Sequence, residues 1–231
     1  MADKPSRALV IYGDGHASLL HAHLHSFASR ASCGFLSLRT PESENDRVVR
    51  ELAQLLDEYD PTVSQRFMGL RAAIITLGFS VLEIDHLSSK LLKMLGFSGG
   101  EVLEESEFDL VILHIWLNKL IGGIMQATQP GLDIASRLHF SIILSYGTVS
   151  ETNSDLSFLR PCQSYTIKGG DIRHHHPMLI AQWQEGVTRR DMARELSFKE
   201  FKEHGGNLAI PADRFLHEVA FKLWKAPKYG A

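Results

Sequence analysis

The residues whose types could bind a metal ion lie at three places along the sequence. Asp14 stands between Gly13 and Gly15, directly after an apolar run over residues 8–12. His114 lies near the end of a second apolar run, and three consecutive histidines, 174–176, precede a third. Carboxylate oxygens and imidazole nitrogens are ligands that proteins use for divalent metals. One stretch of backbone cannot aim all three consecutive rings at one ion, so one or two of them could be ligands.

Each of these residues also has a purely structural interpretation, which the sequence leaves open. Asp14 could cap the turn that follows, because Asp is a common turn and N-cap residue. His114 lies within an apolar run, where a hydrogen-bonded core histidine is commoner than a ligand. The histidines 174–176 could form a polar loop with one buried, hydrogen-bonded ring.

Ser43 is the candidate nucleophile, because it lies in a polar loop that follows the second expected strand. A metal ion lowers the pKa of a bound hydroxyl and so turns a serine into a nucleophile at neutral pH. The neighbours Glu42, Glu44 and Asp46 are acidic. They oppose an anionic substrate unless metal ions neutralise them.

His21 and His25 are four positions apart on an expected helix over residues 16–30 and share one of its faces. Zinc proteases use this spacing with an acidic residue between the histidines, but residues 22–24 are Ala, His and Leu. We interpret the pair as polar helix surface.

Charge and cysteine content narrow the class of protein. The chain has 231 residues, with 24 Lys and Arg against 27 Asp and Glu, a formal net charge of -3. This balance gives no reason to expect nucleic acid or an anionic membrane as partner. No stretch approaches the roughly 20 apolar residues of a membrane span, and the N-terminal residues do not resemble a signal peptide. Cys33 and Cys162 form no disulfide framework or zinc motif, so we expect a reduced, cytoplasmic protein.

The hydrophobic pattern predicts an α/β fold, with a largely parallel sheet and helices on both faces. Expected strands cover residues 8–12, 34–38, 72–76, 108–115, 138–145 and 178–183, with a further candidate at 80–84. Expected helices cover residues 16–30, 47–59, 63–70, 85–95, 117–128, 197–204 and 212–225. Residues 97–107 are expected to form an acidic loop or a short helix. The helix expected over residues 47–59 is amphipathic, and its apolar side is expected to carry Val48, Val49, Leu52, Leu55 and Leu56. We expect one domain over residues 1–231, with an exposed loop region at 148–171.

Together these residues resemble a group of plant proteins described as cofactor-independent (2,3-bisphosphoglycerate-independent) phosphoglycerate mutase-like, in the alkaline phosphatase superfamily. The resemblance covers most of the chain and is strongest over residues 8–38, 137–147 and 172–231. It implies an alkaline-phosphatase-like core and an isomerase or phosphatase that uses a divalent metal, Mn²⁺ or Mg²⁺, on a small phosphorylated metabolite.

The resemblance also assigns roles to particular residues. Asp14 matches the metal-binding aspartate that follows the first strand of the mutases. Ser43 is the nearest counterpart of their transient phosphate carrier. His174 or His175, ahead of Pro177, matches a late metal-binding histidine.

The chain departs from the mutase pattern at two other places. The mutases carry an Asp and a His after the strand that here ends at His114 and Ile115, where this chain has residues 116–120 without either type. They also carry an Asp-His pair after the following strand, where residues 144–148 are Leu, Ser, Tyr, Gly and Thr. A two-metal phosphoryl-transfer site needs about six protein ligands. This chain therefore lacks several of them.

Two functions follow from these observations. The first is a divalent-metal phosphomutase or phosphatase that uses Asp14, His174, His175 and Ser43. The second is a non-catalytic binding or regulatory protein, a pseudoenzyme that kept the scaffold and a remnant ligand pocket. The missing Asp-His pairs favour the second.

Overall fold

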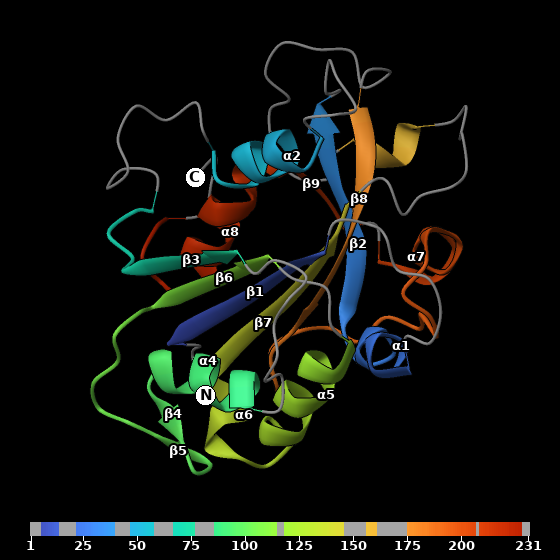
Figure 1. Ribbon diagram of the computed structural model, residues 1–231. Coiled ribbons are helices and arrows are strands. Elements are labelled where there is room, and N and C mark those ends of the chain that lie inside the picture. Colours follow the sequence, from blue (N-terminus) through green and yellow to red (C-terminus); the bar gives the residue numbers. More distant parts are fainter. Residues whose placement is uncertain are drawn as a thin grey trace.

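Seven strands form one mixed sheet in the computed structural model, which describes residues 6–13, 22–39, 47–57, 67–76, 86–114, 118–145, 156–160, 175–206 and 208–227 (Figure 1). The strands are β1 (Arg7–Gly13), β2 (Ser32–Arg39), β3 (Ala72–Thr76), β6 (Leu110–His114), β7 (Leu138–Leu144), β8 (His175–Trp183) and β9 (Leu208–Pro211). Their order in the sheet is β3-β6-β1-β7-β8-β2-β9. β8 runs antiparallel to both β7 and β2, whereas the other neighbouring strands pair in parallel. The expected α/β fold with a largely parallel sheet is confirmed.

Helices cover both faces of this sheet, as the alternation of strands and helices predicts (Figure 1). On one face lie α1 (Ala22–Ala28), α4 (Leu87–Met94), α5 (Asn118–Ala127), α6 (Asp133–Arg137) and α7 (Phe198–His204). On the other lie α2 (Arg47–Leu55) and α8 (Phe215–Lys222), with a 3-10 helix at Ala212–Arg214 before α8. A second 3-10 helix spans Ser157–Leu159. Within the described ranges, no helix is long and apolar enough to cross a membrane.

Two hydrophobic cores, one on each face, follow from the alternation of side chains along the strands. On β1, Leu9 and Ile11 enter the core beneath α1, α4 and α5, which we call the α5-side core. Val10 and Tyr12 enter the core beneath α2 and α8, which we call the α8-side core. The strand is buried on both faces, as expected for a central parallel strand.

Residues 97–102 form a small antiparallel hairpin, so the expectation of an acidic loop or short helix over 97–107 is wrong for these residues, whereas residues 103–107 form the expected acidic loop. Its strands are β4 (Phe97–Ser98) and β5 (Glu101–Val102). Gly99 and Gly100 between them have φ angles of +61° and +93°. Two consecutive glycines that can adopt positive φ are the signal of a tight two-residue hairpin turn.

Of the five apolar residues expected on one side of helix α2, Leu55 is buried and three others, Val48, Leu52 and Leu56, pack against the α8-side core, but Val49 does not. Val49 is 69% exposed, whereas Glu51 is fully buried and Gln54 is nearly so. The Gln54 side chain accepts a hydrogen bond from Arg39 N at 2.9 Å and donates one to Arg39 O at 3.0 Å. This face of α2 therefore meets the polar end of β2 as well as the core, and polar groups at that end need hydrogen-bonding partners.

β8 begins three residues earlier than the expected strand at 178–183, so His175 and His176 lie in a strand and not in a loop. They pair with Arg39 and Leu38 of β2. β9 was not expected from the sequence, because four residues that end in a proline give a weak strand signal.

Candidate functional site

Polar side chains gather at the carboxyl ends of β1, β6 and β7. Tyr12 pairs with His114 in the β1–β6 register, and Ser145 follows the last residue of β7. The Ser145 amide continues the β1–β7 ladder by donating to Gly13 O at 2.9 Å. In open α/β sheets, ligands bind outside the carboxyl ends of the strands. This edge, which also leads into Asp14, is therefore the candidate site.

A buried carboxylate organises this edge. Glu51 of α2 is fully buried. It accepts a hydrogen bond from Tyr12 Oη on one carboxylate oxygen, and one from Ser145 Oγ at 2.8 Å on the other. Arg47 Nε lies 4.0 Å from the Glu51 carboxylate. We call Tyr12, Arg47, Glu51 and Ser145 the Glu51 cluster.

The sequence contained a signal for Glu51 that its residue type concealed. In an amphipathic helix an acidic residue is ordinarily assigned to the solvent face. However, Glu51 lies three positions after Val48 and four before Leu55, so it shares a face with both. A buried carboxylate is stable only with partners, and the hydroxyls of Tyr12 and Ser145 supply them.

Of the four residues to which the resemblance assigns a role, His175 is the one that the structure describes. Its Nδ1 lies 2.6 Å from Ser37 Oγ of β2. Both side chains are buried, with 5% of His175 and 2% of Ser37 exposed. Asp14, Ser43 and His174 lie outside the described residues, as does most of the predicted loop region 148–171. The expected meeting of Asp14 with the late histidines remains a prediction.

His114 and His175 do not come together, although both lie at the same edge of the sheet. His114 lies two residues after Ile112 on β6 and therefore on the same face of the sheet, which is the face of the α8-side core. The centroid of its ring is 5.3 Å from that of the Tyr12 ring. His175 lies four residues before Leu179 on β8, so both are on the opposite face, that of the α5-side core. Three strand spacings of roughly 4.8 Å separate β6 from β8. The two rings therefore cannot share one ion, and the structural interpretation of His114 accords with its packing.

Arg39 is the cationic neighbour of His175. The two residues are directly paired in the β2–β8 register, so their side chains leave the same face of the sheet. Arg39 Nη2 lies 3.2 Å from a carboxylate oxygen of Asp213, and 36% of its side chain is exposed. A guanidinium beside an imidazole is an arrangement suited to anionic oxygens.

His25 has a structural role that the sequence did not indicate. Its Nδ1 accepts a hydrogen bond from the Leu196 amide at 3.1 Å. This contact ties α1 to the segment that precedes α7. The half-buried ring is therefore more than the polar helix surface that we expected. His21 lies outside the described residues.

A second group of hydrogen-bonded polar side chains lies on the α8 side of the sheet. His139 Nε2 is 3.2 Å from Ser141 Oγ, and Lys222 Nζ donates to Gln182 Oε1 at 3.0 Å. Burial, with a smaller contribution from the charge of Lys222, holds the pKa of His139 well below its ordinary value of 6.5. Burial also lowers the pKa of Lys222, against the charge of Glu218, which raises it. His139 is therefore neutral at physiological pH and serves as part of the core.

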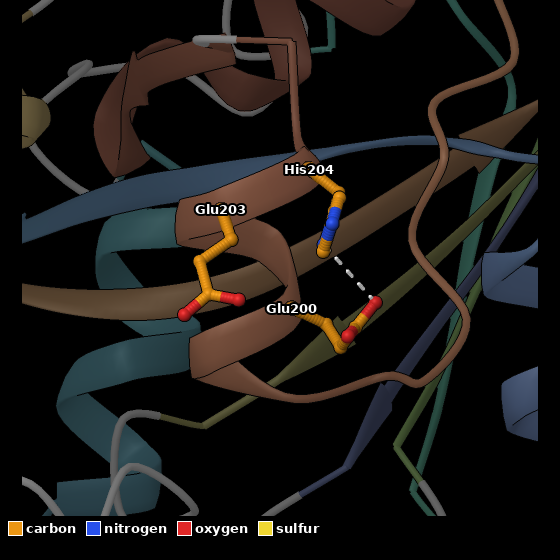
Figure 2. Close-up of side chains that lie close together, drawn as sticks. All are labelled: Glu200, Glu203 and His204. Carbon is orange, nitrogen blue, oxygen red and sulfur yellow. Dashed lines mark ion pairs between the residues drawn. The ribbon is translucent and has the colours of Figure 1, made fainter.

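A group of metal-binding residue types lies on the surface, away from this edge. Figure 2 shows Glu200, Glu203 and His204 of α7, whose possible ligand atoms lie within 4.8 Å of one another. Glu200 forms an ion pair with His204 at 3.4 Å and accepts a hydrogen bond from the Arg194 amide at 2.8 Å. The helix has seven residues, and both Glu203 and His204 are exposed. These contacts account for Glu200 without an ion.

Comparisons with known proteins support the fold class. No family model and no curated protein matches the chain significantly. Among solved structures, it is similar to "Structure of PH0037 protein from Pyrococcus horikoshii", with a TM-score of 0.59 and 11% sequence identity over 100% of each chain. At this identity the similarity shows a shared α/β fold.

Proposed function

We propose that this chain is a phosphoglycerate mutase-like protein with an alkaline-phosphatase-like core, whose two-metal site is incomplete and which binds a small phosphorylated metabolite without turning it over. The resemblance of residues 8–38, 137–147 and 172–231 supports this proposal, together with the largely parallel sheet. The observation that carries it is the Glu51 cluster at the end of β7.

The residues at that place do not fit a second metal ion. By the resemblance, active mutases have an Asp-His pair after the corresponding strand. Here Ser145 donates to Glu51, and the other carboxylate oxygen accepts from Tyr12. The carboxylate thus serves as a hydrogen-bond acceptor between α2, β1 and β7. We therefore derive no phosphoryl-transfer step through two metals.

Arg39 and His175 are the described residues best suited to a phosphate. Arg39 supplies a guanidinium, which matches phosphate oxygens in charge and geometry. It is paired with His175 on one face of the sheet, at the edge where ligands bind in α/β proteins. A phosphorylated metabolite would place its phosphate against these two side chains.

The experiment combines metal analysis, turnover and binding on the purified full chain. We expect no phosphoglycerate mutase activity with Mn²⁺ or Mg²⁺, and calorimetric binding of 3-phosphoglycerate that is lost in Arg39→Met. Arg190→Met is the matched control, because Arg190 is an exposed arginine that contacts Ser29 O instead. Failure of 3-phosphoglycerate to bind the wild-type protein would contradict the proposal.

One observation favours a second candidate, the metal-dependent phosphomutase or phosphatase that uses Asp14, His174, His175 and Ser43. The Nδ1 of His175 is held by Ser37, and metal-binding histidines are commonly oriented by a hydrogen bond at their other ring nitrogen. A turnover with Mn²⁺ that Asp14→Ala abolishes would establish this candidate and overturn the non-catalytic proposal.

A further inference from the structure

We propose that the edge of the sheet opposite the candidate site is a two-fold interface through which this chain binds a second copy of itself. Three segments lie at this edge, where the parallel strands begin. They are residues 101–107 before β6, the turn at residues 129–133 before β7, and residues 184–195 after β8. Because β8 runs antiparallel to β7, the end of β8 lies at the same edge as the start of β7.

Hydrogen bonds and packing join the three segments into one surface. The Gly131 amide donates to both carboxylate oxygens of Glu185, at 3.0 and 3.1 Å, and the Glu185 amide donates to Ala135 O at 3.3 Å. On its other side, α6 contacts β5, and Figure 1 shows the β4–β5 hairpin beside α6. Since β7 lies between β6 and β8 in the sheet, the turn before α6 lies between the other two segments.

Exposed apolar side chains are concentrated on this surface. Of the seven large hydrophobic side chains that are exposed in the described residues, it carries four, Leu103, Leu132, Val187 and Met192. Val187 is 51% exposed and Met192 is 77% exposed. Apolar patches that stay exposed on a folded chain commonly mark interaction sites, and Met is enriched in interface cores. A partner that covers this surface would therefore bury all four side chains.

The β5 side of the surface is acidic. Residues 101–107, which we call the acidic arm, contain no basic residue and four exposed glutamates, Glu101, Glu104, Glu105 and Glu107. In the described part of the chain, none of these four carboxylates has an ion pair or a hydrogen bond. Their charges are therefore available to a partner.

The β8 side of the surface is basic. We call Arg30 and residues 187–195 the basic arm, which holds four arginines, Arg30, Arg189, Arg190 and Arg194, against Asp191 and Glu195. Asp191 is already held by Arg189 at 2.8 Å. Burial, and then the charge of Arg190, lower the pKa of Arg30, because the two guanidinium groups lie near each other without a carboxylate between them. An anionic partner relieves this repulsion.

A second copy of the chain is the partner that this arrangement fits. A two-fold axis through the turn at Leu132 exchanges the two arms, so that the acidic arm of each copy meets the basic arm of the other. The same patch then serves on both subunits, as in other two-fold dimers. Leu132 lies at the axis against Leu132 of the second copy, and the complementary charges on either side fix the register.

Analytical ultracentrifugation of the purified full chain tests the dimer. We expect a species of twice the chain mass of 25.9 kDa. Its dissociation constant should rise at least about tenfold between about 0.1 and 1 M NaCl, because salt screens the two arms. A monomer at every concentration would overturn the proposal. Assemblies that keep growing with concentration would indicate head-to-tail contacts and would overturn the two-fold arrangement.

An aspartate at the axis tests the surface. Leu132→Asp should make the chain monomeric, because two carboxylates would face each other there. The fold tolerates this change, since Leu132 is the N-cap of α6 and Asp is a preferred N-cap residue. Val49→Asp is the matched control, because Val49 is exposed on α2, on the other face of the sheet, and it should leave the dimer intact. A dimer that survives Leu132→Asp would overturn the proposed surface, whether or not the protein binds 3-phosphoglycerate.

Reversed charges test the pairing of the arms. One variant combines Glu104→Lys with Glu105→Lys, and the other combines Arg190→Glu with Arg194→Glu. Each variant alone should be monomeric, because its two arms then carry charges of the same sign. A one-to-one mixture should form a heterodimer, since every arm again meets its opposite, and this recovery also shows that both variants fold. Dimers of either variant alone, or a mixture that stays monomeric, would overturn the pairing.

Discussion

The hydroxyl of Ser145 donates a hydrogen bond of 2.8 Å to the carboxylate of Glu51, 94 positions earlier in the chain. This contact joins the carboxyl end of β7 to α2, and the bond from Tyr12 joins the same carboxylate to β1. One buried side chain thus holds three elements at the edge where the proposed ligand binds.

Removing this carboxylate should destabilise the protein strongly. Glu51→Ala deletes the acceptor of two buried hydrogen bonds, so we expect a loss of about 3 kcal/mol in the free energy of unfolding. Glu51→Gln keeps one acceptor oxygen and should cost less. Urea denaturation measures both. Val49→Ala, on the exposed face of the same helix, is the control and should change stability by less than about 0.5 kcal/mol. Equal effects of Glu51→Ala and Val49→Ala would contradict this account.

His139 should make stability fall with acidity. The pKa of His139 is lowered by burial and then by Lys222, so the unfolded chain takes up a proton that the folded chain does not. The contribution of neutral His139 to the free energy of unfolding is complete above the pKa of this residue in the unfolded chain, near 6.5. It is lost as the pH falls toward the lower pKa of His139 in the folded protein. Between about pH 7.5 and pH 5.5, wild type should lose about 1.4 kcal/mol more than His139→Gln. Urea denaturation at both pH values would reveal it. His86→Gln, at an exposed position, serves as the control, and parallel pH dependence in wild type and His139→Gln would count against this prediction.

Cys33 should be chemically inert in the folded protein. Burial, reinforced by the nearby charge of Asp191, raises the pKa of the Cys33 thiol to about 12. At about pH 8 its thiolate is roughly a thousandfold scarcer than that of an unhindered thiol. In a Cys162→Ser variant, Ellman's reagent should therefore react only after unfolding in urea. Rapid reaction of the folded variant would show that Cys33 is accessible.

Two adjacent glycines after α7 should respond differently to alanine. A Cβ on Gly205 would lie 2.3 Å from Phe201 O and 3.0 Å from Cys33 O, both of them backbone atoms. A Cβ on Gly206 would meet the end of the Arg189 side chain, which can swing away. We expect Gly205→Ala to lose about 2 kcal/mol of stability and Gly206→Ala to lose less than about 1 kcal/mol. Thermal unfolding measures both variants, and the reverse ranking would refute the prediction.

The regular elements were predictable where a single local rule decided them. The apolar run at residues 8–12 is the buried strand β1, and the run at residues 72–76 is the edge strand β3. The helix expected at residues 197–204 is α7, in which the Ser197 side chain caps the first turn by accepting from Glu200 N. β9 depends on its parallel pairing with β2, which no local pattern shows. The start of β8 was missed for the same reason: the backbone at His175 is extended because it pairs with Arg39 of β2, which is distant in the sequence.

The site was less predictable, because its contacts join distant parts of the chain. The sequence placed His175 at the correct edge of the sheet, but it gave no reason to pair that ring with Ser37, 138 positions earlier. Glu51 was not predicted to be buried, because an acidic residue of an amphipathic helix is ordinarily assigned to the solvent face. Its burial depends on hydrogen bonds from Tyr12 and Ser145, at the ends of β1 and β7, which the local sequence does not show. Residue types indicate candidate chemistry, whereas long-range hydrogen bonds determine which atoms remain to perform it.

The position of β8 also governs the order in which the protein can be assembled during synthesis. β2 takes its neighbours in the sheet from β8 and β9, which leave the ribosome long after it. Until residue 183 has emerged, the apolar strand β2 has neither neighbour, and an unpaired apolar strand is prone to aggregate. The half of the sheet that contains β2 must therefore close after translation of most of the chain. Truncation before β8 would release an aggregation-prone product.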